Sequence, residues 1–191
     1  MGVTSSDDVR LATSDDAAAI ADAHVRGWLT AYRGLVPDSI LAGFSVERRT
    51  AQWRDRLASV TPAAETRTWV VVDGGRVLGF VDTGPGRDES APPPDGAGEV
   101  YAIYLAPEAR GRGHGRALFG HAVADLLARG YDPIVVWVFE ANAGGRRFYE
   151  RGGFRLDGAR NVIDFDGTPV PELRYRRPRR RETVASRTIE P

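Results

Sequence analysis

The stretch "PEARGRGHGRALFGHAVADLLARG", residues 107–130, decides the fold. Gly111, Gly113 and Gly115 stand directly before an apolar pattern with helical period. Glycine loses more backbone entropy on folding than any other residue, so three of them in five positions need a reason. Without side chains, backbone N–H groups can converge on one point, where the following helix adds partial positive charge. The stretch therefore predicts a nest for an anion such as a pyrophosphate, with a tight structural turn as the alternative.

The composition of the 191-residue chain limits the classes of function. Hydrophobic residues make up 42% and charged residues 27%, which is typical of a soluble globular domain. The net charge is zero, so there is no general attraction to nucleic acid or to a membrane. We find neither an apolar run of transmembrane length nor a signal-peptide pattern, and we expect a cytoplasmic protein. Cysteine and lysine are absent, which excludes disulfides and a phosphate loop of the GxxxxGK[ST] kind.

Hydrophobic periodicity and turn residues predict the order of the elements. We expect a strand, three helices, a hairpin, a strand, a helix, a strand, a helix and a closing hairpin. The central strand–helix–strand crossover predicts parallel pairing, and the hairpins predict antiparallel pairing on both sides. The expected class is therefore α/β with a mixed sheet, in a single domain over residues 1–177. An Arg-rich tail over residues 178–191 is expected to be disordered.

Local signals predict several boundaries. Ser14 or Asp15 can cap the first helix and Ser45 the third, because their side chains can accept a backbone N–H. A further helix is expected over residues 114–129. The Pro/Gly/Asp-rich segment over residues 85–98 predicts a loop long enough to cover a site.

Two blocks of sequence match a known family. "RGRGHG", Arg110 to Gly115, resembles the [QR]-x-x-G-x-[GA] motif of the GNAT superfamily of acetyl-CoA-dependent N-acetyltransferases. "FEANAGGRRFYERGGF", residues 139–154, is similar to the family's N-x-x-A-x-x-x-Y-x-x-x-G-F block, with Asn142 in register and Gly145 where the family usually has alanine. The resemblance covers residues 8–177. It implies the GNAT acyl-CoA N-acyltransferase fold, in the order β-α-α-β-β-β-α-β-α-β-β, with a splayed central sheet.

The resemblance implies a binding site for acetyl-CoA. Backbone N–H groups of the glycine loop would bind the pyrophosphate, and the pantetheine arm would pair with the preceding strand. Arg110 would order the loop, with a solvent-exposed arginine as the alternative. Asn142 would hydrogen-bond the pantetheine region, with a helix cap or turn as the alternative. The implied cofactor-binding residues are Ile103, Tyr104, Leu105, Arg110, Gly111, Arg112, Gly113, His114, Gly115, Arg116 and Asn142.

Tyr149 and Glu99 are the candidate catalytic residues. The resemblance implies that Tyr149 protonates the leaving thiolate, with a core tyrosine as the alternative. Glu99 stands eleven residues before Arg110, as does the catalytic glutamate of the family's histone-acetylating branch, and would take the proton of the acceptor amine. Strand alternation places Glu99 on one face with Tyr101, Ile103 and Leu105, and the alternative is a polar first residue of a strand. Catalysis by positioning alone also stays open.

The expected reaction is direct transfer of acetyl from acetyl-CoA to a primary amine of a small molecule or peptide, in a ternary complex. The alternative is a catalytically inactive CoA-binding sensor or interaction module. Nucleic-acid binding through "RYRRPRRR", residues 174–181, is not expected, because the segment is short and lies beyond the fold. Trp28, Tyr32 and Arg33 fall in a region that often lines the acceptor pocket in such folds, with packing as the alternative. The histidines lack metal-binding spacing, so no metal is expected, and a homodimer is left open.

Overall fold

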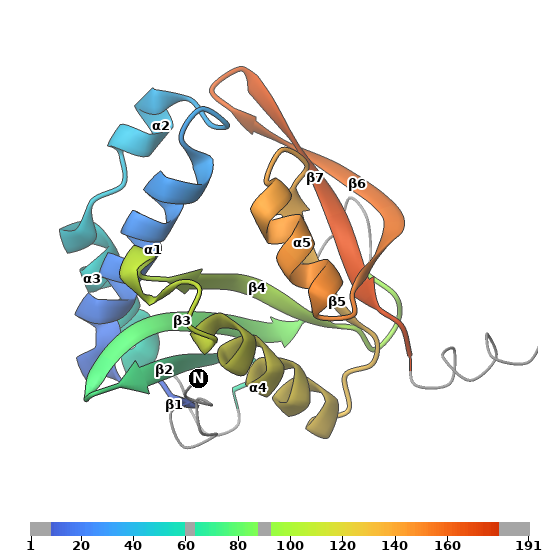
Figure 1. Cartoon of the computed structure of the whole chain (residues 1–191), viewed down its shortest axis with the longest axis horizontal. Helices are drawn as coiled ribbons and strands as arrows, with labels where there is room; N and C mark the ends of the chain where they lie inside the picture. The colour runs from blue at the N-terminus through green and yellow to red at the C-terminus, as the bar shows by residue number, and fades with distance from the viewer. Residues whose placement is uncertain (1–8, 60–63, 88–92, 180–191) are drawn as a thin grey trace, which may run out of the picture.

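A seven-stranded mixed sheet runs through the part of the chain that the computed structural model describes, residues 9–59, 64–87 and 93–179 (Figure 1). The strands are β1 (Val9–Leu11), β2 (Arg67–Asp73), β3 (Arg76–Pro85), β4 (Gly98–Leu105), β5 (Ile134–Phe139), β6 (Arg155–Phe165) and β7 (Thr168–Arg177). They lie in the order β1-β2-β3-β4-β5-β7-β6. The β4–β5 pair is parallel and the other neighbours are antiparallel, as the crossover and the hairpins predict.

Helices cover both faces of this sheet. The helices are α1 (Ala17–Tyr32), α2 (Asp38–Ala42), α3 (Val46–Ala58), α4 (His114–Ala128) and α5 (Ala143–Arg151). In one core, α1 and α3 pack against Val70 and Phe80, whereas α4 and α5 pack in the other core with Val71 and Val81. Because neighbouring strand residues point to opposite faces, the two cores lie on opposite sides of the sheet. None of the helices in the described ranges has the length and apolar composition needed to cross a bilayer.

The caps of the first and third helices differ in how well local sequence predicts them. Ser45 caps α3 as expected, and its Oγ accepts the N–H of Arg48 at 3.3 Å. The prediction of Ser14 or Asp15 as the first cap is wrong. The chain enters α1 through a 3-10 turn capped at Thr13, whose N–H donates to the Asp16 carboxylate at 2.8 Å.

The two central strands separate soon after they meet. β4 and β5 pair only where Gly98–Val100 lies beside Ile134–Val136. Beyond Val100, β4 continues to Leu105 while paired only with β3 among the described strands. The β5-facing edge of β4 is therefore open over residues 103–105, which is the splay that the family resemblance implies.

A β-bulge in β4 changes which residues face which core. The β3–β4 ladder passes over Tyr101, which is the extra residue of the bulge. Val100 therefore packs in the same core as Ile103 and Leu105. Its neighbour Glu99 lies on the opposite face. The prediction that Glu99 shares a face with Ile103 and Leu105 is wrong, because strict alternation takes no account of a bulge.

Two predicted segments fall partly outside the described residues. These are residues 180–191 of the Arg-rich tail and residues 88–92 of the loop after β3. The predicted helix after the glycine cluster agrees with α4 to within one residue at its end.

Candidate active site

The glycines between β4 and α4 meet two different structural requirements. Gly111 and Gly113 have φ of +76° and +96°, a region that L side chains rarely adopt, and Gly113 is the N-cap of α4. Gly115 lies against β4 instead, where a Cβ would come within 3.0 Å of Leu105 Cδ1. The first two glycines shape the loop at the helix N-terminus, and the third lets α4 approach the strand.

A groove of about 770 Å³ lies where β4 and β5 separate. Its wall is formed by β4, the glycine loop, the start of α4, β5, α5 and the end of α1. The structure brings ten of the sequence-predicted site residues together along it: Ile103, Tyr104, Leu105, Arg110, Gly111, Gly113, Gly115, Arg116, Asn142 and Tyr149.

The charges on the wall of the groove are all positive. Arg110, Arg116 and Arg151 line it, and none of the described aspartates or glutamates does. The structure shows no side-chain hydrogen bond or ion pair from these three arginines to other described residues. Unpaired guanidinium groups favour an anionic ligand, and Arg110 and Arg116 belong to the loop and first turn at the N-terminus of α4.

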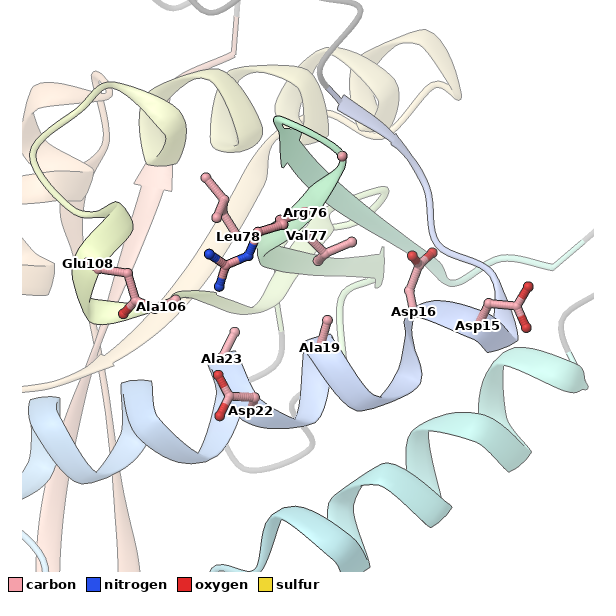
Figure 2. A pocket seen from close by; sticks show the side chains of 11 residues that line it. Asp15, Asp16, Ala19, Asp22, Ala23, Arg76, Val77, Leu78, Ala106 and Glu108 are labelled. Atoms are coloured by element: carbon pink, nitrogen blue, oxygen red, sulfur yellow. The ribbon is translucent and has the colours of Figure 1, made fainter.

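A second cavity, of about 360 Å³, has the opposite character (Figure 2). It lies between α1, the start of β3 and the turn at Pro107–Ala109. Figure 2 shows Asp22 and Glu108 on its wall near Arg76. Both carboxylates pair with Arg26, at 3.0 and 2.6 Å. This acidic cavity is unsuited to phosphate, so the groove between β4 and β5 is the candidate site.

The side chains of two residues of the predicted loop, His114 and Arg112, do not line the groove. His114 is 6% exposed and is not on the groove wall. Its Nε2 lies 3.8 Å from Asp73 Oδ2 on the β2–β3 hairpin. Arg112 is exposed and also lies off the groove. For His114 and Arg112, therefore, a contact between the backbone and a ligand stays a prediction, and a side-chain contact is not expected.

Tyr149 lies in the groove with a free hydroxyl. Its side chain comes from α5 and is 8% exposed, and its hydroxyl makes no hydrogen bond to another described residue. Burial, together with the nearby Tyr32, raises the pKa of Tyr149 well above its ordinary value. The phenol is therefore protonated at neutral pH, which suits a proton donor and not a base.

Tyr32, at the end of α1, lies near Tyr149 on the groove wall. Its hydroxyl oxygen is 3.4 Å from that of Tyr104, and burial raises the pKa of both phenols. These neutral hydroxyls are hydrogen-bond donors at the end of the groove closest to α1.

Asn142 caps α5, which is the structural alternative considered from sequence. Its Oδ1 accepts the N–H of Gly145 at 2.9 Å. A Cβ at position 145 would lie 2.9 Å from Asn142 Nδ2 and 3.1 Å from Val138 Cγ2. Glycine in place of the family's usual alanine therefore permits this close approach. Because Asn142 also lines the groove, the cap does not exclude a ligand contact from its Nδ2.

Glu99 is not brought onto the same wall as Tyr149. Its carboxylate is buried and accepts the N–H of Arg87 at 3.0 Å, with the Arg87 guanidinium 3.4 Å from the other oxygen. That guanidinium lies over the ring of Tyr101, 3.3 Å from its centroid. Tyr101 lines the groove and Glu99 does not. A role for Glu99 as base stays a prediction.

Arg151 and the ring of Phe148 are groove residues that the sequence reasoning missed. The helical period of α5 could have indicated these two residues from the sequence. Gly145, Phe148 and Gly152 are spaced i, i+3 and i+7, which places them on one face, and all three line the groove. Arg151 borders this face.

The comparisons with known proteins agree with this geometry. The sequence model of the acetyltransferase (GNAT) family matches residues 28–154. The uncharacterised N-acetyltransferase YuaI of Bacillus subtilis is 35% identical over 136 residues, which cover 70% of this chain and 72% of that protein. A mycothiol acetyltransferase of Geodermatophilus obscurus is 37% identical over 105 residues, or 54% of this chain. The match spans only 31% of that longer relative.

Two solved structures share the fold at low sequence identity. The PaiA N-acetyltransferase of Thermoplasma acidophilum, in complex with coenzyme A, has a TM-score of 0.65 at 17% identity and covers 86% of this chain and 96% of its own. YncA of Salmonella typhimurium, solved with acetyl-CoA, has a TM-score of 0.63 at 20% identity and covers 88% of this chain and 91% of its own. Because the family match extends over more than half of the chain, and YuaI matches most of both sequences, the chain belongs to the GNAT family of acetyltransferases.

Proposed function

We propose that this acetyltransferase moves the acetyl group of acetyl-CoA directly to a primary amine of a small molecule or peptide. One observation carries the proposal. The glycine loop at a helix N-terminus, an open strand edge and a protonated tyrosine all lie along the same groove.

The groove fits coenzyme A in three respects. The loop from Gly111 to Gly115 offers backbone N–H groups and a helix N-terminus to the pyrophosphate. Arg110 and Arg116 add positive charge beside it. The open edge of β4 over residues 103–105 offers backbone groups to the amides of the pantetheine arm. That PaiA and YncA were solved with coenzyme A and acetyl-CoA supports the same ligand here.

The transfer needs little covalent chemistry from the protein. The nitrogen of the neutral amine attacks the thioester carbonyl carbon, and the carbon–sulfur bond breaks. The Tyr149 hydroxyl donates its proton to the departing sulfur, which leaves as a thiol, and then regains a proton from solvent. The amine nitrogen loses one proton as the amide forms, so the products are the N-acetyl amine and coenzyme A.

Glu99 is the proposed acceptor of the amine's proton. Because its carboxylate lies off the groove wall, the proton would pass through a water beside Tyr101. The acceptor itself is proposed to enter on the α1 side, next to Tyr32. Several relatives are named mycothiol acetyltransferases, which supports acetyl transfer by this chain.

A panel of amines assayed with a thiol-reactive dye tests the proposal. The chain contains no cysteine, so the dye reports only coenzyme A released from the donor. We expect amine-dependent release, with initial-rate patterns of a ternary complex and no acetylated enzyme. Tight coenzyme A binding without release for any amine would favour the alternative, an inactive CoA-binding sensor. Absence of coenzyme A binding would refute both the proposed acetyl transfer from acetyl-CoA and the inactive CoA-binding sensor.

A further inference from the structure

Arg151, the last residue of α5, lies on the groove wall. The next residue, Gly152, packs on α4, where a Cβ would come within 3.1 Å of Phe119 Cε1. Phe119 is in the second turn of α4, and the nest is at the N-cap, Gly113. At 1.5 Å per residue, the two places are about 9 Å apart along the helix axis. The C-terminal end of α5, which carries Arg151, is therefore displaced along α4 from the glycine loop.

The charge of Arg151 has no counterpart in the groove. Its guanidinium makes no hydrogen bond or ion pair with another described residue. Among the described residues, those that line the groove include no carboxylate. Other exposed arginines without a partner among the described residues, such as Arg147, lie off the groove, and Arg160 is paired with Glu140 at 2.6 Å. An unpaired guanidinium at this place favours a second anionic group, separate from the one held by the nest.

Coenzyme A carries such a group. Two of its phosphates form the pyrophosphate, and the third is a phosphomonoester on the 3′ carbon of the ribose. We propose that Arg151 binds this 3′-phosphate and thereby selects coenzyme A over donors that lack it. The inference rests on the proposed function, because it assigns coenzyme A to the groove. The planar guanidinium can donate two parallel hydrogen bonds to phosphate oxygens, and the doubly charged phosphomonoester strengthens them.

The test compares coenzyme A with 3′-dephospho-coenzyme A by titration calorimetry. We expect the unmodified protein to bind coenzyme A about tenfold more tightly, the scale of one charge-assisted contact. Arg151→Gln should bind both ligands equally, with the affinity that the unmodified protein has for the dephospho form. The preference should also fall as salt rises, because Arg151 is exposed.

Two variants separate this role from others. Arg147→Gln, on the same helix but off the groove, should keep the full preference. Arg110→Gln should weaken the binding of both ligands by the same factor, because Arg110 is proposed to act beside the pyrophosphate, which both ligands carry. If Arg151→Gln weakens both ligands equally, Arg151 belongs to the pyrophosphate site and the proposal is overturned. Equal binding of the two ligands by the unmodified protein overturns it as well, whereas failure to bind either ligand refutes the proposed function. Melting temperatures show whether each variant is folded.

Discussion

Replacing Tyr149 by phenylalanine removes one hydroxyl from the groove and leaves the packing of the ring intact. The ring of Tyr149 lies 5.6 Å from that of Phe119 and 5.4 Å from that of Phe148, and a phenylalanine keeps both contacts. The hydroxyl has no hydrogen-bond partner among the described residues, so its removal strands no buried donor or acceptor. We therefore expect the free energy of unfolding to change by less than about 0.5 kcal/mol.

Turnover should respond much more strongly. General acid catalysis typically contributes about 10²- to 10⁴-fold. A thiol has a reference pKa of about 8.5, so the thiolate is a fair leaving group without help, and burial makes Tyr149 a weak acid. Both facts favour the lower end of the range. We expect kcat for Tyr149→Phe to fall about 100-fold, with the affinity for coenzyme A changed less than about threefold.

Tyr175 supplies a matched control. It is 1% exposed and lies near Tyr149, but its hydroxyl donates to Glu150 at 2.8 Å and accepts from Arg146 at 3.1 Å. Tyr175→Phe should therefore lower the free energy of unfolding by about 1–2 kcal/mol and leave kcat unchanged. The assay is dye-detected release of coenzyme A, with an acceptor slow enough that the chemical step limits the rate. Equal kcat for Tyr149→Phe and the unmodified protein under that condition would show that Tyr149 only packs.

Three further changes probe the loop, the candidate base and the entry to α1. Gly113→Val puts a branched side chain at φ +96°, so we expect about 1–2 kcal/mol of strain and weaker acetyl-CoA binding. Unchanged affinity by calorimetry would show that this loop does not bind the pyrophosphate. Glu99→Gln should lower kcat/KM about 100-fold near neutral pH, by less as pH rises and solvent supplies free amine; a pH–rate series showing a constant factor would make Glu99 a positioning residue. The ion pair with Arg10 holds the pKa of Asp16 below its ordinary 3.8, so its stabilisation is present above that pH and is lost as pH falls through the depressed pKa. The melting temperature of Asp16→Asn should therefore lie below that of the unmodified protein at pH 7, and the gap should narrow in acid; a gap independent of pH would exclude this linkage.

The sequence by itself determined the order of the elements and the backbone conformation of the loop. Both depend on short-range properties of the chain. Helical and strand periods extend over a few residues, and the Asp73-Gly74-Gly75 turn closes its hairpin locally. Positive φ at Gly111 and Gly113 is likewise a local backbone requirement that glycine signals directly.

The tertiary structure decided which of these residues meet. The bulge at Tyr101 arises from the register between β3 and β4, and it moved Glu99 to the face opposite Ile103. The splay of β4 from β5 opened the groove, and the packing of α5 on α4 carried Arg151 to its wall. Register and helix packing are set by contacts between segments far apart in the chain, so no local pattern contains them.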